Sequence, residues 1–156
     1  MVYFILIFLC VFLDQITKHI VYQNIRYNDY IVVINNFFYI SHRRNTGAAW
    51  SFLSEYEWSR YMFIAITIIV CVFLAYLLVK SKNALLNISL ALIIGGASGN
   101  LTDRILKGYV VDFLEFVFGT YHYPTFNVAD ICVVIGTILL SCYLIFIYEN
   151  DKERVI

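Results

Sequence analysis

Four long apolar runs limit what this chain can fold into. They lie at about residues 2–22, 61–79, 83–104 and 128–148. Each run is long enough to cross roughly 30 Å of hydrocarbon as a helix of about 20 residues. Helices and closed barrels are the structures that satisfy all backbone hydrogen bonds in lipid. The sequence therefore predicts an all-α membrane protein with a bundle of four transmembrane helices.

The composition supports a membrane location. Of the 156 residues, 62% are hydrophobic and 14% are charged, whereas a soluble domain is about half apolar and about a quarter charged. The formal net charge is zero, so we expect no nucleic-acid partner. Because the runs fill about half of the chain and no linker separates them, we interpret residues 1–156 as a single membrane-embedded domain.

The first run contains two charged residues, Asp14 and Lys18. A cleavable signal peptide is the alternative for this run, but no basic segment precedes the apolar part and no small-residue cleavage site follows it. The two charges are four residues apart, with the acid first, which favours a pair on one helix face. We interpret them as an internal ion pair that packs this helix, in preference to a direct chemical role.

The loop that follows, residues 23–60, is rich in aromatic and β-branched residues. Segments 30–34 and 37–42 are separated by two asparagines, so they predict a β-hairpin and a small sheet at the membrane interface. Asn45 and Gly47 then precede a short apolar patch that ends at Leu53.

The second and third runs are joined by three residues only, 80–82, so their helices must be antiparallel neighbours. The third run contains Gly95 and Gly99 in GxxxG spacing, which lets helix backbones approach closely in lipid. We expect the polar end of this helix to present three side chains on one face, namely Asn100, Asp103 and Arg104.

Four spans place both chain ends on one side of the membrane and both long loops, 23–60 and 105–127, on the other. Polar residues from most of the chain should then gather near the loop-side surface: Lys18, Asn45, Asn100, Asp103, Arg104, Asp112 and Asp130. Lysine and arginine occur on both sides, so the positive-inside rule does not fix the orientation.

Two aspartates, Asp112 and Asp130, stand near the ends of the connection VVDFLEFVFGTYHYPTFNVAD. An ionisable residue at membrane depth is costly unless it is paired or used, so each suggests a function. Each also has a structural alternative. Asn127 and Asp130 have the spacing of a helix capping box, and Asp112 with Glu115 could begin a short helix through FLEFVF. Because both aspartates are expected on one surface together with a polar cluster, we favour a catalytic role over capping.

Two neighbouring carboxylates cannot both ionise cheaply, so one keeps its proton. The charged member can take a proton from water while the neutral member protonates an amide, which is acid–base chemistry for peptide hydrolysis. The sequence has no GxSxG, HExxH or CxxC motif, and its four cysteines lie in apolar runs. We therefore predict no metal and no cofactor.

Five motifs resemble those of the lipoprotein signal peptidase family, the bacterial signal peptidases II, and they occur in the family order over nearly the whole chain. They are DQxTK at Asp14–Lys18, RNxGAAW at Arg44–Trp50, GGAxGNxxDR at Gly95–Arg104, VVDF at Val110–Phe113 and FNxAD at Phe126–Asp130.

This resemblance implies an aspartic endopeptidase that cuts signal peptides from prolipoproteins before a diacylglyceryl-modified cysteine. Asp112 and Asp130 would be catalytic, and Asn45 and Arg104 would bind the substrate backbone. Support for the site is expected from Asp14, Lys18, Gly47, Asn100, Asp103 and Asn127. The family also implies a multi-pass protein of the bacterial cytoplasmic membrane, with cytoplasmic termini and an outward-facing active site. We expect a monomer whose partners are the prolipoprotein and membrane lipid.

We further predict that Asp130 is the charged member of the pair, because it should lie in the first turn of the last helix, where the dipole favours negative charge. Two other classes stay open on the residues alone. One is a small ion or proton transport subunit with an intramembrane acidic path, and the other is a structural assembly subunit in which the aspartates are dispensable.

Overall fold

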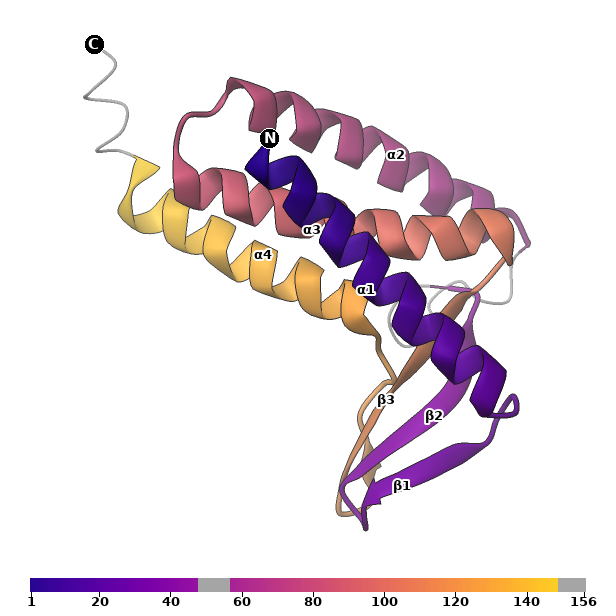
Figure 1. Ribbon diagram of the computed structural model, residues 1–156. Coiled ribbons are helices and arrows are strands. Elements are labelled where there is room, and N and C mark those ends of the chain that lie inside the picture. The colour runs from indigo at the N-terminus through magenta and orange to yellow at the C-terminus, as the bar shows by residue number, and fades with distance from the viewer. Residues whose placement is uncertain (48–56, 149–156) are drawn as a thin grey trace.

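The computed structural model describes residues 1–47 and 57–148 of the chain. It contains four long helices, α1 (Val2–Asn24), α2 (Glu57–Lys80), α3 (Ala84–Leu106) and α4 (Val128–Phe146) (Figure 1). All four are long and apolar enough to cross a membrane. The predicted four-helix membrane bundle is therefore confirmed, with helix ends within a few residues of the expected positions.

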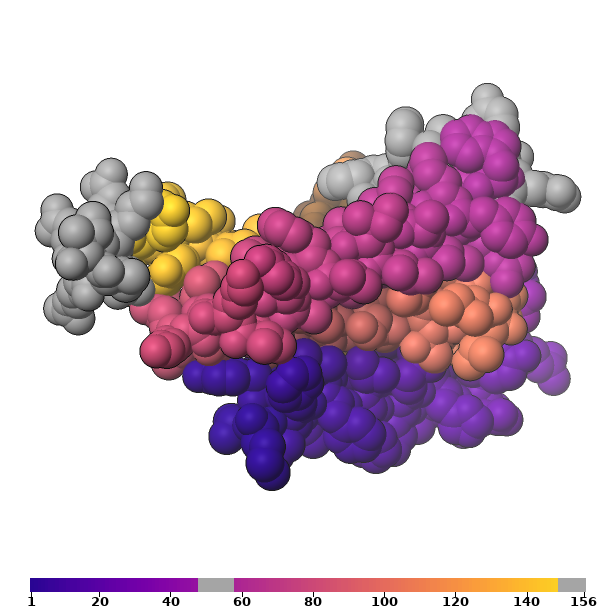
Figure 2. Space-filling view, turned by 90° about the horizontal axis from the view of Figure 1, so that it is seen from above, coloured from indigo at the N-terminus to yellow at the C-terminus, as the bar shows by residue number. Residues whose placement is uncertain are grey.

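Helix α3 is the centre of the bundle. It packs against α1, α2 and α4, and the space-filling view shows it enclosed between α1 and α2 (Figure 2). A Cβ atom on Gly95 would lie 2.6 Å from the Cβ of Cys10, and one on Gly99 would lie 2.5 Å from Oδ2 of Asp14. Both glycines thus let α1 approach the backbone of α3, as the GxxxG spacing predicts.

A four-stranded antiparallel sheet lies at one end of the bundle, where α1 ends and α4 begins, and the N-terminus lies at the other end (Figure 1). Its strands, in spatial order, are β1 (Tyr30–Ile34), β2 (Phe38–Asn45), β3 (Val110–Phe118) and β4 (Tyr121–His122). The predicted hairpin is confirmed as β1 and β2. Asn36 in its turn has a φ of 57°, a conformation that asparagine tolerates well.

The helix considered for FLEFVF is wrong, because these residues form most of strand β3. Aromatic and β-branched side chains suit a buried strand, and the backbone of β3 pairs with β2, so that Asp112 faces Arg43 in the register. Asp112 therefore caps no helix. The expected apolar patch after Gly47 and the polar tail after Tyr148 lie outside the described residues.

Candidate active site

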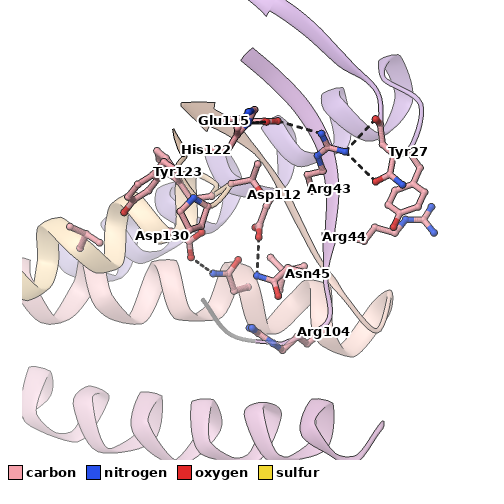
Figure 3. A pocket seen from close by; sticks show the side chains of 17 residues that line it. Tyr27, Arg43, Arg44, Asn45, Arg104, Asp112, Glu115, His122, Tyr123 and Asp130 are labelled. Carbon is pink, nitrogen blue, oxygen red and sulfur yellow. Dashed lines mark hydrogen bonds and ion pairs between the residues drawn. The ribbon is translucent and has the colours of Figure 1, made fainter. Parts of the chain in front are cut away.

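One cavity of about 730 Å³ lies where the sheet meets the bundle, and it contains both aspartates singled out in the sequence. Asp112 reaches it from β3 and Asp130 from the start of α4 (Figure 3). The remaining polar and charged side chains of its wall are Tyr27, Asn28, Arg43, Arg44, Asn45, Asn100, Arg104, Glu115, His122, Tyr123 and Thr125. Residues that are far apart in the sequence thus share one space.

Asp130 is fixed by the first turn of α4. Its Oδ2 accepts a hydrogen bond from the backbone N–H of Asn127 (3.1 Å), and its own N–H donates to Oδ1 of Asn127 (3.0 Å). This reciprocal pair is the predicted capping box. The other oxygen, Oδ1, accepts from Nδ2 of Asn100 (2.8 Å). The capping role and the place in the cavity are therefore compatible, since the cap orients the carboxylate.

Asp112 is almost fully buried, with 2% of its surface exposed. Its Oδ2 accepts from Nδ2 of Asn45 (3.0 Å), and its Oδ1 accepts from Nδ2 of Asn127 (2.6 Å). Burial, and after it the negative charge of Asp130, raise the pKa of Asp112 to about 7, against the opposing effect of the two amide donors and Lys18. Asp112 can therefore hold a proton near neutral pH.

Asn127 connects the two aspartates directly. Its backbone N–H binds Asp130 and its side-chain amide binds Asp112. The same amide also donates to Oδ1 of Asn100 (3.1 Å). Both carboxyl groups are thus held against one residue that is fully buried, which fixes their relative position.

A group of four charged residues lies beside the cavity, inside the bundle, and we call it the bundle charge cluster: Asp14, Lys18, Asp103 and Lys107. Nζ of Lys18 is 2.8 Å from Oδ2 of Asp14 and 3.3 Å from Oδ2 of Asp103. Lys107 binds the other oxygen of Asp103 at 2.8 Å. The predicted ion pair of Asp14 and Lys18 is confirmed, and it extends to two further charges.

Lys18 also determines how Asn100 is oriented. Its Nζ donates to Oδ1 of Asn100 (2.8 Å), so that Nδ2 of the same amide faces Asp130. Asp103, in contrast, faces away from the cavity and accepts from the backbone N–H of Val111 (3.1 Å). Of the three side chains expected on one face at the end of α3, Asn100 and Arg104 line the cavity and Asp103 does not.

Arg104 and Gly47 meet at the rim of the site. Nη2 of Arg104 donates to the carbonyl oxygen of Gly47 (3.1 Å), and the N–H of Gly47 donates to Oδ1 of Asn45 (3.0 Å). The second contact leaves Nδ2 of Asn45 directed at Asp112 (Figure 3). The α2 residue Arg60 holds the backbone carbonyl of Arg104 at 2.9 Å. The rim is thus tied to both α2 and α3.

The sequence did not reveal several side chains that line the sheet side of the cavity, among them Tyr27, Arg43, Glu115, His122 and Tyr123. The pairing of β2, β3 and β4 brings Arg43, Glu115 and His122 together. Once residues 110–118 are considered a strand, charged residues within that apolar stretch would have been a usable signal. In residues 1–47 and 57–148, no group of His, Cys, Asp and Glu could hold a metal ion.

Comparison with known proteins is consistent with this geometry. Residues 6–146 match the family described as signal peptidase (SPase) II. The chain is 43% identical over 155 residues to the lipoprotein signal peptidase of Bacillus pumilus (strain SAFR-032), with 98% of each chain covered. This chain belongs to the signal peptidase II family.

Further relatives extend the same result. The lipoprotein signal peptidase of Actinobacillus succinogenes is 44% identical over 145 residues, which cover 91% of this chain and 86% of that protein. A bacterial membrane enzyme solved by the in meso method at 2.3 Å resolution has a TM-score of 0.86 and 36% identity, over 97% of this chain and 92% of that one. Signal peptidase II membership makes this protein a multi-pass membrane hydrolase of bacterial lipoprotein processing.

Proposed function

We propose that this protein is an aspartic endopeptidase that cuts prolipoproteins immediately before a diacylglyceryl-modified cysteine, with Asp112 and Asp130 as the catalytic pair. The observation that carries the proposal is the binding of both carboxyl groups to Asn127 inside one cavity at the end of a membrane bundle. The raised pKa of Asp112 supports a division of roles, in which Asp112 is the acid and Asp130 the base.

The charge of Asp130 has two sources of stabilisation. It lies in the first turn of α4, where the helix dipole favours an anion, and it accepts hydrogen bonds from Asn100 and from the backbone of Asn127. Asp112 lies on a strand, which offers no comparable dipole. The resting enzyme accordingly has a charged Asp130 and a protonated Asp112.

In the first step, the Asp130 carboxylate removes a proton from a water molecule, and the water oxygen bonds to the scissile carbonyl carbon. Asp112 gives its proton to the carbonyl oxygen, so the intermediate is a neutral gem-diol, with Asp130 protonated and Asp112 charged. In the second step, the C–N bond breaks, one diol proton passes to Asp112 and the proton on Asp130 passes to the leaving nitrogen. Both aspartates return to their starting states.

The rim residues hold the substrate in this proposal. Asn45 contacts Asp112, and Arg104 lines the same cavity; both have donors that can bind peptide carbonyl oxygens. The scissile bond of a lipid-anchored substrate stays near the membrane surface, and the cavity lies where the helices end and the sheet begins. We place both termini in the cytoplasm and the cavity at the outer face, and we expect the monomer to be sufficient.

A cleavage assay with matched variants tests the catalytic pair. Purified full-length protein in detergent micelles is incubated with a diacylglyceryl-modified precursor peptide, and mass spectrometry identifies the products. We expect a new N-terminus at the modified cysteine. Asp112→Asn and Asp130→Asn should each lower kcat by about 10³-fold or more, as expected for loss of a general acid or base.

The control is Asp29→Asn, which changes an exposed aspartate outside the cavity and should retain full activity. Circular dichroism and thermal unfolding show whether each variant is folded. Wild-type turnover in a folded Asp112 or Asp130 variant would refute the aspartic mechanism, and a cut at another bond would refute the cleavage site.

A further inference from the structure

The cavity extends beyond the two aspartates along the sheet. This sheet-side arm is formed by Arg43 on β2, Glu115 on β3 and His122 on β4. Figure 3 shows their side chains next to one another, on the far side of Asp112 from Arg104. None of the three lies in the motifs that carry the family resemblance, and the chemistry proposed above uses none of them. The arm therefore needs an explanation of its own.

Glu115 contacts both of the other residues of the arm. It is 9% exposed, its Oε2 is 3.6 Å from Nη2 of Arg43, and its Oε1 is 3.2 Å from Nδ1 of His122. Oε2 is inaccessible and accepts no hydrogen bond from any described residue. Arg43 is further fixed by Asn28, whose two oxygens lie 3.3 Å from Nη1. The Arg43 guanidinium in the wall of the cavity thus has partners from both Glu115 and Asn28.

A bound substrate meets Arg43 before it meets Glu115. The Arg43 side chain is 35% exposed, compared with 12% for the Glu115 side chain. A guanidinium presents several N–H donors in one plane and binds carboxylates through two parallel hydrogen bonds. The arm thus presents the positively charged Arg43 guanidinium to the cavity, while the negatively charged Glu115 carboxylate is largely buried.

The two ends of the cavity differ in what surrounds them. One end reaches Val134, about one helical turn beyond Asp130 in the membrane span α4, and the other end is the sheet-side arm. A signal peptide contains an apolar segment, which suits the end that lies among the helices. With the scissile bond at the aspartates, the lipid-modified cysteine directly follows the bond, and the polar chain after this cysteine leaves along the sheet.

We infer that the sheet-side arm binds the residues that follow the lipid-modified cysteine in the mature lipoprotein, and that Arg43 favours an acidic side chain there over a basic one. This inference rests on the proposed function, since it takes the scissile bond to lie at Asp112 and Asp130. It assigns a specificity role to residues outside the catalytic pair.

Three precursor peptides that differ in one residue test the preference. They carry Asp, Asn or Lys immediately after the lipid-modified cysteine, and kcat/KM is measured for each with the full-length protein in micelles. Because Arg43 is partly exposed and already paired, we expect the Asp peptide to exceed the Lys peptide by about three- to fivefold, within the range of exposed charge pairs. Arg43→Gln should reduce this ratio to about one.

Arg26→Gln is the matched control, because Arg26 is exposed and does not line the cavity. This variant should keep the wild-type ratio. An unchanged ratio in Arg43→Gln, or equal cleavage of all three peptides by the wild type, would overturn the inference while leaving the proposed function intact. Failure of the wild type to cut any peptide would instead count against the proposed function.

A photo-crosslinking experiment places the substrate without changing Arg43. A photoreactive residue is built into the precursor two residues after the cysteine, and the uncut complex is held by the Asp112→Asn variant. Label on residues 115–123 supports the inference. A second precursor carries the photoreactive residue on the signal-peptide side of the cysteine. If this probe labelled residues 115–123 and the mature-side probe did not, the inference would be overturned.

Discussion

The bundle charge cluster and the cavity each contain two aspartates near the end of α3, but the partners of these aspartates differ. In the cluster, both carboxylates contact lysine nitrogens within 3.3 Å, and two acids balance two bases. In the cavity, the carboxyl groups are held by asparagine side chains and by one backbone N–H group, that of Asn127. No lysine or arginine of the described residues forms an ion pair with either cavity aspartate.

This difference shows how one residue type serves two purposes. A carboxylate paired with a buried cation holds helices together, because removal of either partner leaves an uncompensated charge. A carboxyl group held by neutral amides keeps its position but not a fixed protonation state, so it can exchange a proton with water. Asn100 joins the two regions, since Lys18 binds its oxygen and Asp130 binds its nitrogen.

The largest effect is expected from Lys18→Met. The substitution leaves Asp14 and the inner oxygen of Asp103 without their cation in a fully buried place. Breaking a buried ion pair in this way costs about 3–5 kcal/mol, so the unfolding midpoint in detergent should fall clearly. Unfolding is followed by circular dichroism at fixed detergent concentration. A midpoint equal to that of the wild type would show that the cluster does not hold the bundle.

The activity of the cavity should depend on pH. Asp112 has a pKa of about 7, and its protonated form is the acid in the proposed mechanism. The value of kcat should therefore fall above about pH 7, approaching tenfold per pH unit while Asp112 alone limits the rate. A profile that stays flat up to pH 9 would show that a protonated Asp112 is not required for turnover.

The same pKa makes a prediction about stability. In the unfolded chain Asp112 titrates near 3.9, so between about pH 4 and pH 7 the folded protein binds more protons at this residue. The contribution of Asp112 to the free energy of unfolding therefore decreases as pH rises through that range and is constant above it. Asp112→Asn should lack this decrease when unfolding midpoints are compared from pH 4 to pH 8.

The contrast between the two regions was only partly visible in the sequence. The pairing of Asp14 with Lys18 and the capping box of Asn127 are local, so their spacing along a helix was enough. The roles of Asp103 and Glu115 could not be predicted in this way, because each has a partner on an element that is distant in the sequence. A helix through residues 113–118 was an alternative because Asp112 and Glu115 have the spacing of a helix cap. Burial on both faces of the strand removes the alternation that would have marked it.

A smaller effect is expected from Gly99→Ala, which tests how closely α1 must approach the cluster. The new methyl group would lie 2.5 Å from Oδ2 of Asp14 and 3.3 Å from Cβ of Ala129. Relief of that overlap requires a shift of α1 or a new rotamer of Asp14, and overpacking of this kind costs about 1–3 kcal/mol. The unfolding midpoint should drop by less than in Lys18→Met. A midpoint equal to or higher than that of the wild type would show that the interface between α1 and α3 can accommodate the methyl group.

Lys107→Met should have the smallest effect and separates the outer from the inner half of the cluster. Lys107 binds Asp103 at 2.8 Å, like Lys18 with Asp14, but 28% of its side chain is exposed whereas Lys18 is fully buried. Water can replace a partly exposed cation, so the loss should stay below about 1 kcal/mol. Added salt should shrink it further, because exposed pairs are screened more strongly than buried ones. If Lys107→Met proved as damaging as Lys18→Met, burial would not be what distinguishes the two lysines, and the short contact to Asp103 would have to be the common cause.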